Sequence, residues 1–280
     1  MKKLIIAIMM IAIVATSVLA FAGCGNTSSN LIGFDTDLAK AVAEELGVEV
    51  KFQEISWDAK ETELASKNID LIWNGLTISA DRIEAFEISS PYLYNKQVAV
   101  IRKTDKSKYT NVETIANGKV TYENGSAGAI LAEEKNFPDQ IGVQSQMMAI
   151  TEVLSGTSDV AILDSVLANF YVNSDASYSS LMVVDIDAPA EQYGIAARKK
   201  DVGTIDKINT ALRALAENGK LEEIANKYGL TSELCLDEIK AYESKWDTLT
   251  AEQKSGWEYI QNNGKFVVGY TLYAPIAYTE

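Results

Sequence analysis

Segments typical of strands and of helices alternate along most of this 280-residue chain, and this order limits the fold more than any other feature. Residues 48–55 alternate in polarity as a half-buried strand does, residues 69–73 and 160–163 are mostly apolar, and a further strand is expected at residues 119–122. Helical patterns are found at residues 35–46, 58–66, 205–218 and 220–228 and after residues 126 and 165. Strands that alternate with helices predict an α/β fold with mostly parallel sheets.

Two strand-like stretches are expected to connect two lobes. Residues 97–102 lead away from the first group of strands and helices, and residues 192–197 return to it. We expect lobe 1 to comprise residues 31–98 and 196–280 and lobe 2 to comprise residues 99–195. Clefts between such lobes are common ligand sites.

The order of the elements is unusual at both ends of the chain. The helix expected from Asp35, its predicted N-cap, to Gly47, its predicted C-terminal glycine, has no strand before it. The strand expected at residues 265–270 has no helix after it, and joining the two would complete a β-α unit. We therefore predict a circular permutation that makes the first strand C-terminal. The alternative is that residues 255–280 begin a second, tandem domain.

The beginning of the chain reads as an export signal. Two lysines precede an uncharged, apolar run over residues 4–22, and a short polar linker occupies residues 24–30. The sequence around Cys24 resembles the lipobox of bacterial lipoproteins, with Phe21 where leucine is usual. We expect removal of residues 1–23 as a signal peptide. A lipid on Cys24 then holds the protein at the outer face of the cell membrane, in the periplasm if an outer membrane is present. The alternative is an uncleaved membrane anchor, which also places the rest of the chain outside the cytoplasmic membrane.

The composition excludes several classes of protein. The chain has no histidine, which excludes Ser-His-Asp and Cys-His catalysis and the common histidine-containing zinc sites. Two cysteines cannot form a four-cysteine zinc site, and we expect Cys235 to be a buried apolar residue. The net charge of −14 disfavours binding to nucleic acid. We expect no metal and no cofactor.

Four short motifs are more informative together than alone. They are Gly33-Phe-Asp-Thr-Asp-Leu-Ala-Lys-Ala, Asn74-Gly-Leu-Thr-Ile-Ser-Ala-Asp-Arg82, Ser89-Ser-Pro-Tyr92 and Tyr193-Gly-Ile-Ala. This set resembles the polar amino acid-binding proteins of ABC importers, which are similar to histidine- and glutamine-binding proteins. The resemblance covers nearly all of residues 31–230 and the strand that begins at residue 265. It implies a type II periplasmic-binding-protein fold, in which two α/β lobes joined by two hinge strands enclose the ligand.

A free amino acid carries a carboxylate and an ammonium, so its site needs a cation and an anion. Arg82 is the expected cation, because its planar guanidinium matches a carboxylate through two hydrogen bonds. The resemblance implies that Thr77 shares this carboxylate and that the carbonyl of Gly75, beside Asn74, accepts from the ammonium. The alternative is that Arg82 is a solvated surface residue.

Lobe 2 is expected to supply the opposite charge. Asp164 follows a strand at the edge where ligands of open α/β sheets bind, and the resemblance implies that it binds the ammonium; the alternative is a helix N-cap. Ser126 and the Ala127 backbone open a helix whose amides can bind the carboxylate. Glu123 stands where the glutamine receptor has a lysine, and it either receives a cationic side chain or points to solvent. We expect a polar or basic ligand.

Two aromatic residues complete the expected site. The resemblance places Tyr273 against the ligand side chain and Trp57 in an apolar part of the pocket, the alternative for Trp57 being the core. Trp73 is expected in the core, because strand alternation turns it away from Asn74.

These features predict a monomeric, lipid-anchored receptor that closes its lobes on an L-amino acid and delivers it to an ABC permease in the membrane. One alternative is an enzyme similar to cyclohexadienyl dehydratase on the same fold, for which Glu123 is the candidate general acid. Another is a ligand-sensing module, although no transmembrane helix or kinase-like segment follows the predicted lobes.

Overall fold

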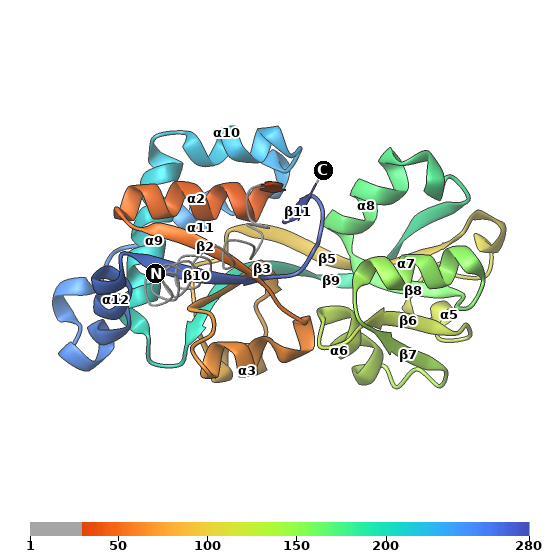
Figure 1. Cartoon of the computed structure of the whole chain (residues 1–280). Coiled ribbons are helices and arrows are strands. Elements are labelled where there is room, and N and C mark those ends of the chain that lie inside the picture. The colour runs from red at the N-terminus through yellow and green to blue at the C-terminus, as the bar shows by residue number, and fades with distance from the viewer. Residues whose placement is uncertain (1–29, 280) are drawn as a thin grey trace, which may run out of the picture. The chain divides into compact units, whose positions relative to one another are not determined.

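A nine-stranded mixed sheet runs through residues 30–279, the part of the chain that this computed structural model describes. Its strand order is β2-β10-β3-β9-β5-β8-β6-β7, with β4 paired to β9 (Figure 1). The strands are β1 (Leu31–Ile32), β2 (Glu49–Glu54), β3 (Leu71–Thr77), β4 (Phe86–Ile88), β5 (Leu93–Arg102), β6 (Val120–Glu123), β7 (Gln140–Val143), β8 (Val160–Asp164), β9 (Leu181–Arg198), β10 (Lys265–Tyr270) and β11 (Tyr278–Thr279). The α-helices are α2 (Phe34–Leu46), α3 (Lys60–Ala65), α4 (Ala80–Ala85), α5 (Val112–Ile115), α6 (Ala127–Glu134), α7 (Gln146–Ser155), α8 (Ser165–Ser174), α9 (Val202–Glu217), α10 (Lys220–Lys227), α11 (Leu236–Lys240) and α12 (Ala251–Asn263).

Two lobes share this sheet. Lobe 1 contains β2, β10 and β3, in which β10 is parallel to both neighbours, together with α2, α3, α4 and α9 to α12 (Figure 1). Lobe 2 contains the parallel strands β8, β6 and β7 with α5 to α8. Strands β5 and β9 are antiparallel to each other and pass through both lobes. The predicted α/β architecture is confirmed, and the expected lobe limits fall inside these two long strands.

Helix α2 ends where the sequence predicted but begins at a different residue. Gly47 ends the helix in the left-handed conformation (φ 68°), as predicted. The prediction for Asp35 is wrong, because the N-cap is Gly33 and the helix begins before the aspartate. The carboxylate of Asp35 is buried instead, and it accepts hydrogen bonds from Gly75 N (2.9 Å) and the Tyr92 hydroxyl (2.8 Å). Asp35 therefore connects α2 to β3, the strand that contains Gly75.

The last strand completes the sheet of lobe 1 within the same chain. Strand β10 lies between β2 and β3, and β1 pairs with β11 as a two-stranded antiparallel ribbon that sets Leu31 opposite Thr279. Tyr278 of this ribbon packs against Phe170 of α8 in lobe 2, with ring centroids 5.7 Å apart. The circular permutation itself remains a prediction.

A segment of short helices connects α10 to β10 and is fixed to α9. The buried carboxylate of Asp206 accepts hydrogen bonds from the Tyr242 hydroxyl (2.7 Å), the Ser244 hydroxyl (2.8 Å) and Lys245 N (2.6 Å). Three donors from this connection thus satisfy one buried carboxylate of α9.

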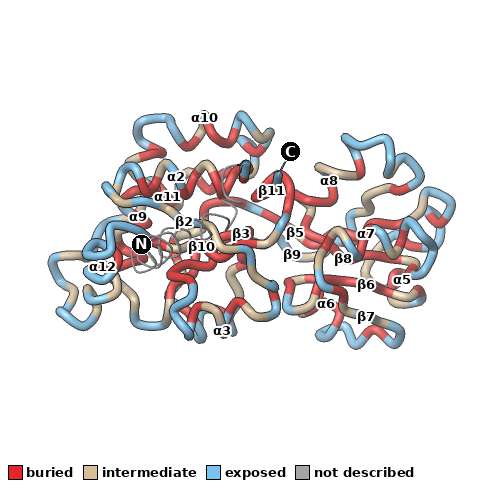
Figure 2. Tube along the Cα trace, in the orientation of Figure 1, coloured by how far each residue is buried: buried red, intermediate tan, exposed pale blue. Residues whose placement is uncertain are grey.

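Buried residues follow the central strands of both lobes (Figure 2). Every residue of β3 and of β8 is buried, as expected for strands covered on both faces. Trp73 is only 1% exposed and belongs to the core, and Cys235 is buried with a free thiol; both observations match the predictions.

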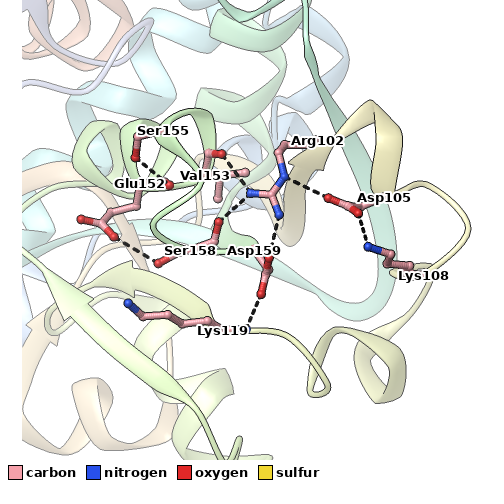
Figure 3. A network of polar contacts seen from close by, with 9 residues as sticks. All are labelled: Arg102, Asp105, Lys108, Lys119, Glu152, Val153, Ser155, Ser158 and Asp159. Atoms are coloured by element: carbon pink, nitrogen blue, oxygen red, sulfur yellow. Dashed lines mark hydrogen bonds and ion pairs between the residues drawn. The ribbon is translucent and has the colours of Figure 1, made fainter.

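At the end of β5, a polar network fixes the loop that enters lobe 2 (Figure 3). Arg102 donates to Asp105 (2.9 Å) and Asp159 (2.6 Å) and to the carbonyls of Val153 and Ser158. Lys108 pairs with Asp105 as well. These ion pairs attach residues 103–108, which follow β5, to lobe 2.

The predicted signal peptide, Cys24 and most of the linker lie outside the described residues, so these assignments remain predictions. Among residues 30–279, no helix is both long enough and apolar enough to cross a membrane.

Candidate functional site

A small cavity receives residues from both lobes, and all ten predicted ligand-binding residues line it. The cavity is small, with about 10 Å³ open to the centre of a water molecule, which is roughly the space that one water needs. The lining residues are Trp57, Asn74, Gly75, Thr77, Arg82, Glu123, Ser126, Ala127, Gln146, Asp164, Thr271 and Tyr273.

Arg82 lies on α4 and is only 6% exposed, so the alternative of a solvated surface arginine is wrong. Its guanidinium donates to the carbonyls of Thr77 (2.8 Å) and Gly125 (3.1 Å). Within residues 30–279 it forms no ion pair with a carboxylate, although Arg102, Arg198 and Arg213 each do. The charges of Asp164, Glu191 and Glu61 favour the charged guanidinium from beyond ion-pair distance, so a ligand carboxylate could still pair with it directly.

The end of β3 presents backbone and amide groups to the cavity. Gly75 has a positive φ (62°). A Cβ there would lie 2.8 Å from the Tyr273 ring and 3.1 Å from the Tyr193 ring, so this position requires a glycine. Asn74 accepts from Thr271 N (2.9 Å), while the buried amide nitrogen of Asn74 has no partner among the described residues. The Thr77 hydroxyl donates to Glu191 (3.1 Å). The unpaired Asn74 amide is a donor that a ligand can use.

Asp164 ends β8 and holds the acidic side of the cavity. One carboxylate oxygen accepts from the amides of Asn95 and Gln97, both at 2.7 Å, and the other accepts from Gln146. Asp164 also occupies the N-cap position of α8, as the alternative expected, but its side chain accepts no hydrogen bond from the helix amides. Burial raises the pKa of Asp164, and the three amides oppose that shift.

Glu123 and the start of α6 form the neighbouring wall. Glu123 is the last residue of β6 and is 4% exposed, so it faces the cavity and not solvent. Burial and the nearby Asp164 raise the pKa of Glu123 to about 8. Ser126 caps α6 by accepting from Ala129 N (3.1 Å), and Ala127 begins the helix. Free amides of a first helical turn favour an anion at this point.

Both predicted aromatic residues contact the cavity. The Tyr273 hydroxyl shares a hydrogen bond with the Tyr193 hydroxyl (2.7 Å), which orients the ring. Trp57 lines the cavity and also packs in a core cluster of lobe 1, and its contact with a ligand stays a prediction.

The sequence analysis missed several residues of this region. Gln146 follows β7 at the same edge of the sheet as Asp164, so the strand-end rule that found Asp164 was sufficient to find it. Glu191 and Lys60 carry no such signal. The Glu191 carboxylate reaches Thr77 only because β9 crosses between the lobes, and Lys60 reads in sequence as an ordinary helix lysine.

The site combines two cations, Arg82 and Lys60, with three acids, Glu123, Asp164 and Glu191. Besides the effect of burial, Asp164 raises the pKa values of Arg82, Glu123 and Glu191, and the charge of Arg82 lowers the pKa of Lys60. No group of three or more potential metal ligands occurs within residues 30–279. This arrangement can hold a molecule that carries both a carboxylate and an ammonium.

Comparison with known proteins gives consistent results. The family model of bacterial extracellular solute-binding proteins, family 3, matches residues 14–231. The arginine-binding extracellular protein ArtP of Bacillus subtilis is 29% identical over 206 residues, which cover 71% of this chain and 78% of ArtP.

Two solved structures support the same fold. The arginine-, lysine-, histidine-binding protein ArtJ from Geobacillus stearothermophilus has a TM-score of 0.67 at 29% identity, covering 74% of this chain and 90% of ArtJ. The ancestral amino acid-binding protein AncCDT-1, a precursor of cyclohexadienyl dehydratase, has a TM-score of 0.64 at 30% identity, covering 70% and 84%.

Proposed function

Because the chain belongs to the bacterial extracellular solute-binding proteins of family 3, we propose that it is a receptor that binds one L-amino acid between its lobes and delivers it to an ABC importer. The observation that carries this proposal is the buried guanidinium of Arg82, which lacks a carboxylate partner within residues 30–279. The α-carboxylate of a ligand would be that partner, with Ser126 and Ala127 as further donors. The ammonium would meet Asp164 and the Gly75 carbonyl.

The same proposal includes a ligand with a cationic side chain. Because its pKa is raised to about 8, Glu123 is mostly protonated in the free protein at neutral pH, and a cationic side chain placed beside it would favour the ionised carboxylate and pair with it. Glu123 is the acceptor proposed for that side chain, and Tyr273 the ring against which it stacks. The arginine-binding ArtP and the arginine-, lysine-, histidine-binding ArtJ support this choice.

The receptor works by closure of its lobes about β5 and β9. In the open form the ligand would meet only one lobe, whereas the closed form engages Arg82 from lobe 1 and Asp164 from lobe 2. Contacts made only in the closed form shift the population toward it. A lipid on Cys24 would keep this monomeric receptor beside its permease, outside the cytoplasmic membrane.

A binding screen tests the proposal. We expect arginine, lysine or histidine to raise the melting temperature most among the twenty amino acids, because a ligand that binds only the folded state stabilises it. Calorimetry then gives the dissociation constant. Tight binding of aspartate or glutamate with no binding of arginine, lysine and histidine would contradict the ligand class, and binding of no amino acid would contradict the function.

A second candidate function is that of a dehydratase-like enzyme. Its support is the buried Glu123, whose pKa of about 8 suits a general acid at neutral pH, and the similarity to AncCDT-1. Incubation with cyclohexadienyl carboxylic acids, followed by absorbance or mass spectrometry, separates the two: turnover that is lost in Glu123→Gln would establish the enzyme.

We also retain the circular permutation as a proposal, together with lobe limits at residues 98/99 and 195/196. The pairing of β10 with β2 and β3, and of β1 with β11, supports it. A rearranged gene that starts at Lys265 and joins residue 280 to Leu31 should give a protein that binds the same ligand with similar affinity. A product that fails to fold would contradict the permutation.

A further inference from the structure

Lys60 is a buried lysine that the proposed binding mechanism does not use. It begins α3, is 5% exposed, and its ammonium lies 5.1 Å from the centre of the Trp57 ring. Lysine is almost never this buried unless it is paired. Burial, with the nearby Arg82 second, lowers the pKa of Lys60 to about 8. A group that is so costly to bury must be held by specific contacts.

The contacts of Lys60 reach across the cleft. Its ammonium donates to the carbonyl of Trp57 in lobe 1 (3.1 Å) and to the carbonyl of Gly125 in lobe 2 (3.2 Å). Arg82 donates to the same Gly125 carbonyl (3.1 Å). Two cations of lobe 1 therefore converge on one backbone oxygen of lobe 2.

Gly125 is shaped for this approach. It follows β6, has a positive φ (69°), and a Cβ there would lie 3.2 Å from the Lys60 nitrogen and 3.4 Å from Asp58 Cα. Glycine leaves the space that the loop needs to reach α3. The next two residues are Ser126 and Ala127, the donors proposed for the ligand carboxylate.

We propose that Lys60 is a positioning residue that fastens the Gly125 turn of lobe 2 to lobe 1, so that the start of α6 faces the ligand carboxylate held by Arg82. This proposal rests on the proposed function and adds a residue that touches no part of the ligand. The contact exists only while the lobes are together, since its donor and acceptor belong to different lobes. It therefore favours the closed form before any ligand binds, which raises the apparent affinity.

Acidic neighbours keep the ammonium in place. Glu61, Glu123 and Asp58 each raise the pKa of Lys60 through their charge, against the effects of burial and of Arg82. Lys60 also offsets part of the negative charge beside Glu123. Its removal thus frees the turn and leaves the acidic wall less balanced.

Hydrogen exchange of the full chain without ligand tests whether Lys60 fastens the Gly125 turn to lobe 1. In Lys60→Met, which keeps the length of the side chain and removes its donors, amides of residues 124–130 should exchange about tenfold faster than in the unaltered protein. Lys60→Arg should restore most of the protection, because it keeps a cationic donor. Lys51→Met, at an exposed lysine of the same lobe, is the matched control and should change nothing there.

Ligand binding gives the second readout. Lys60→Met should weaken amino acid affinity by about three- to tenfold, mostly through faster dissociation, because less of the protein is closed. Unchanged exchange in residues 124–130, or exchange that rises equally throughout both lobes, would overturn the proposal. If the unaltered protein binds no amino acid, the proposed function fails. The exchange result still shows whether Lys60 holds the Gly125 turn.

Discussion

Two arginines of this protein sit in opposite electrostatic surroundings. Arg102, in the network of Figure 3, donates to two carboxylates and two carbonyls that all belong to lobe 2. Arg82 is more deeply buried, yet within residues 30–279 it donates only to two carbonyls, one of them in the other lobe. Arg102 is thus saturated by its own protein, whereas Arg82 retains capacity for an anion.

The acids near the two arginines differ in the same way. Hydrogen bonding to Lys108 and Arg102 holds the pKa of Asp105 below its usual range. Burial instead raises the pKa values of Glu123 and Asp164 in the cleft. Paired charges stabilise a fold, and charges kept short of partners are where a ligand gains most by binding. The difference separates a structural cluster from a binding site.

Arg82→Ala should have the largest effect on binding. Loss of the guanidinium leaves the ligand carboxylate without its main partner, so amino acid affinity should fall at least about tenfold, and about hundredfold as the central expectation. Isothermal titration calorimetry measures the change. Unchanged affinity would show that Arg82 does not bind the ligand carboxylate and that it does not differ from Arg102 in this respect.

Glu123→Gln should reduce affinity for arginine by about tenfold and for a neutral amino acid much less. At pH 6 the carboxyl, with its pKa of about 8, is protonated in the free protein, so a cationic ligand must displace the proton. Arginine affinity should therefore rise with pH, by up to about tenfold per unit between pH 6 and 8. Titrations in that range should show no such rise for Glu123→Gln; a persistent rise would assign the proton to another group.

Tyr273→Leu should have a smaller effect, about threefold weaker binding of a cationic ligand, because it removes stacking and keeps apolar volume. The control variant is Tyr273→Phe, which keeps the ring and loses only the hydrogen bond to Tyr193. Equal losses in both variants would show that the hydroxyl contributes and the ring does not.

Arg102→Ala should leave affinity within about twofold of the unaltered protein while lowering the melting temperature by a few degrees. The modest loss reflects a side chain that is about a quarter exposed. Thermal unfolding and calorimetry on the same sample check both parts. A large loss of affinity here would break the separation between the two clusters.

Much of the site was accessible from sequence because its residues follow strands or open helices. Asp164 ends a strand, Ser126 caps a helix, and Arg82 stands early in a short helix that Ser79 caps. Such positions cluster at one edge of a sheet whatever the rest of the chain does. The burial of Asp35, which replaces its predicted N-cap role, was not predictable in the same way, since it depends on Gly75 and Tyr92 from other elements.

The sequence alone determined the α/β order and most of the polar residues that line the cavity, because the order follows from local periodicity and the residues from motifs that resemble those of a known family. Only the tertiary structure decided which charges remain short of partners. Whether Arg82 meets a carboxylate, and whether Lys60 meets solvent or Gly125, depends on which strands and turns the two lobes bring together. Pairing and burial are properties of the packed chain, and no local pattern encodes them.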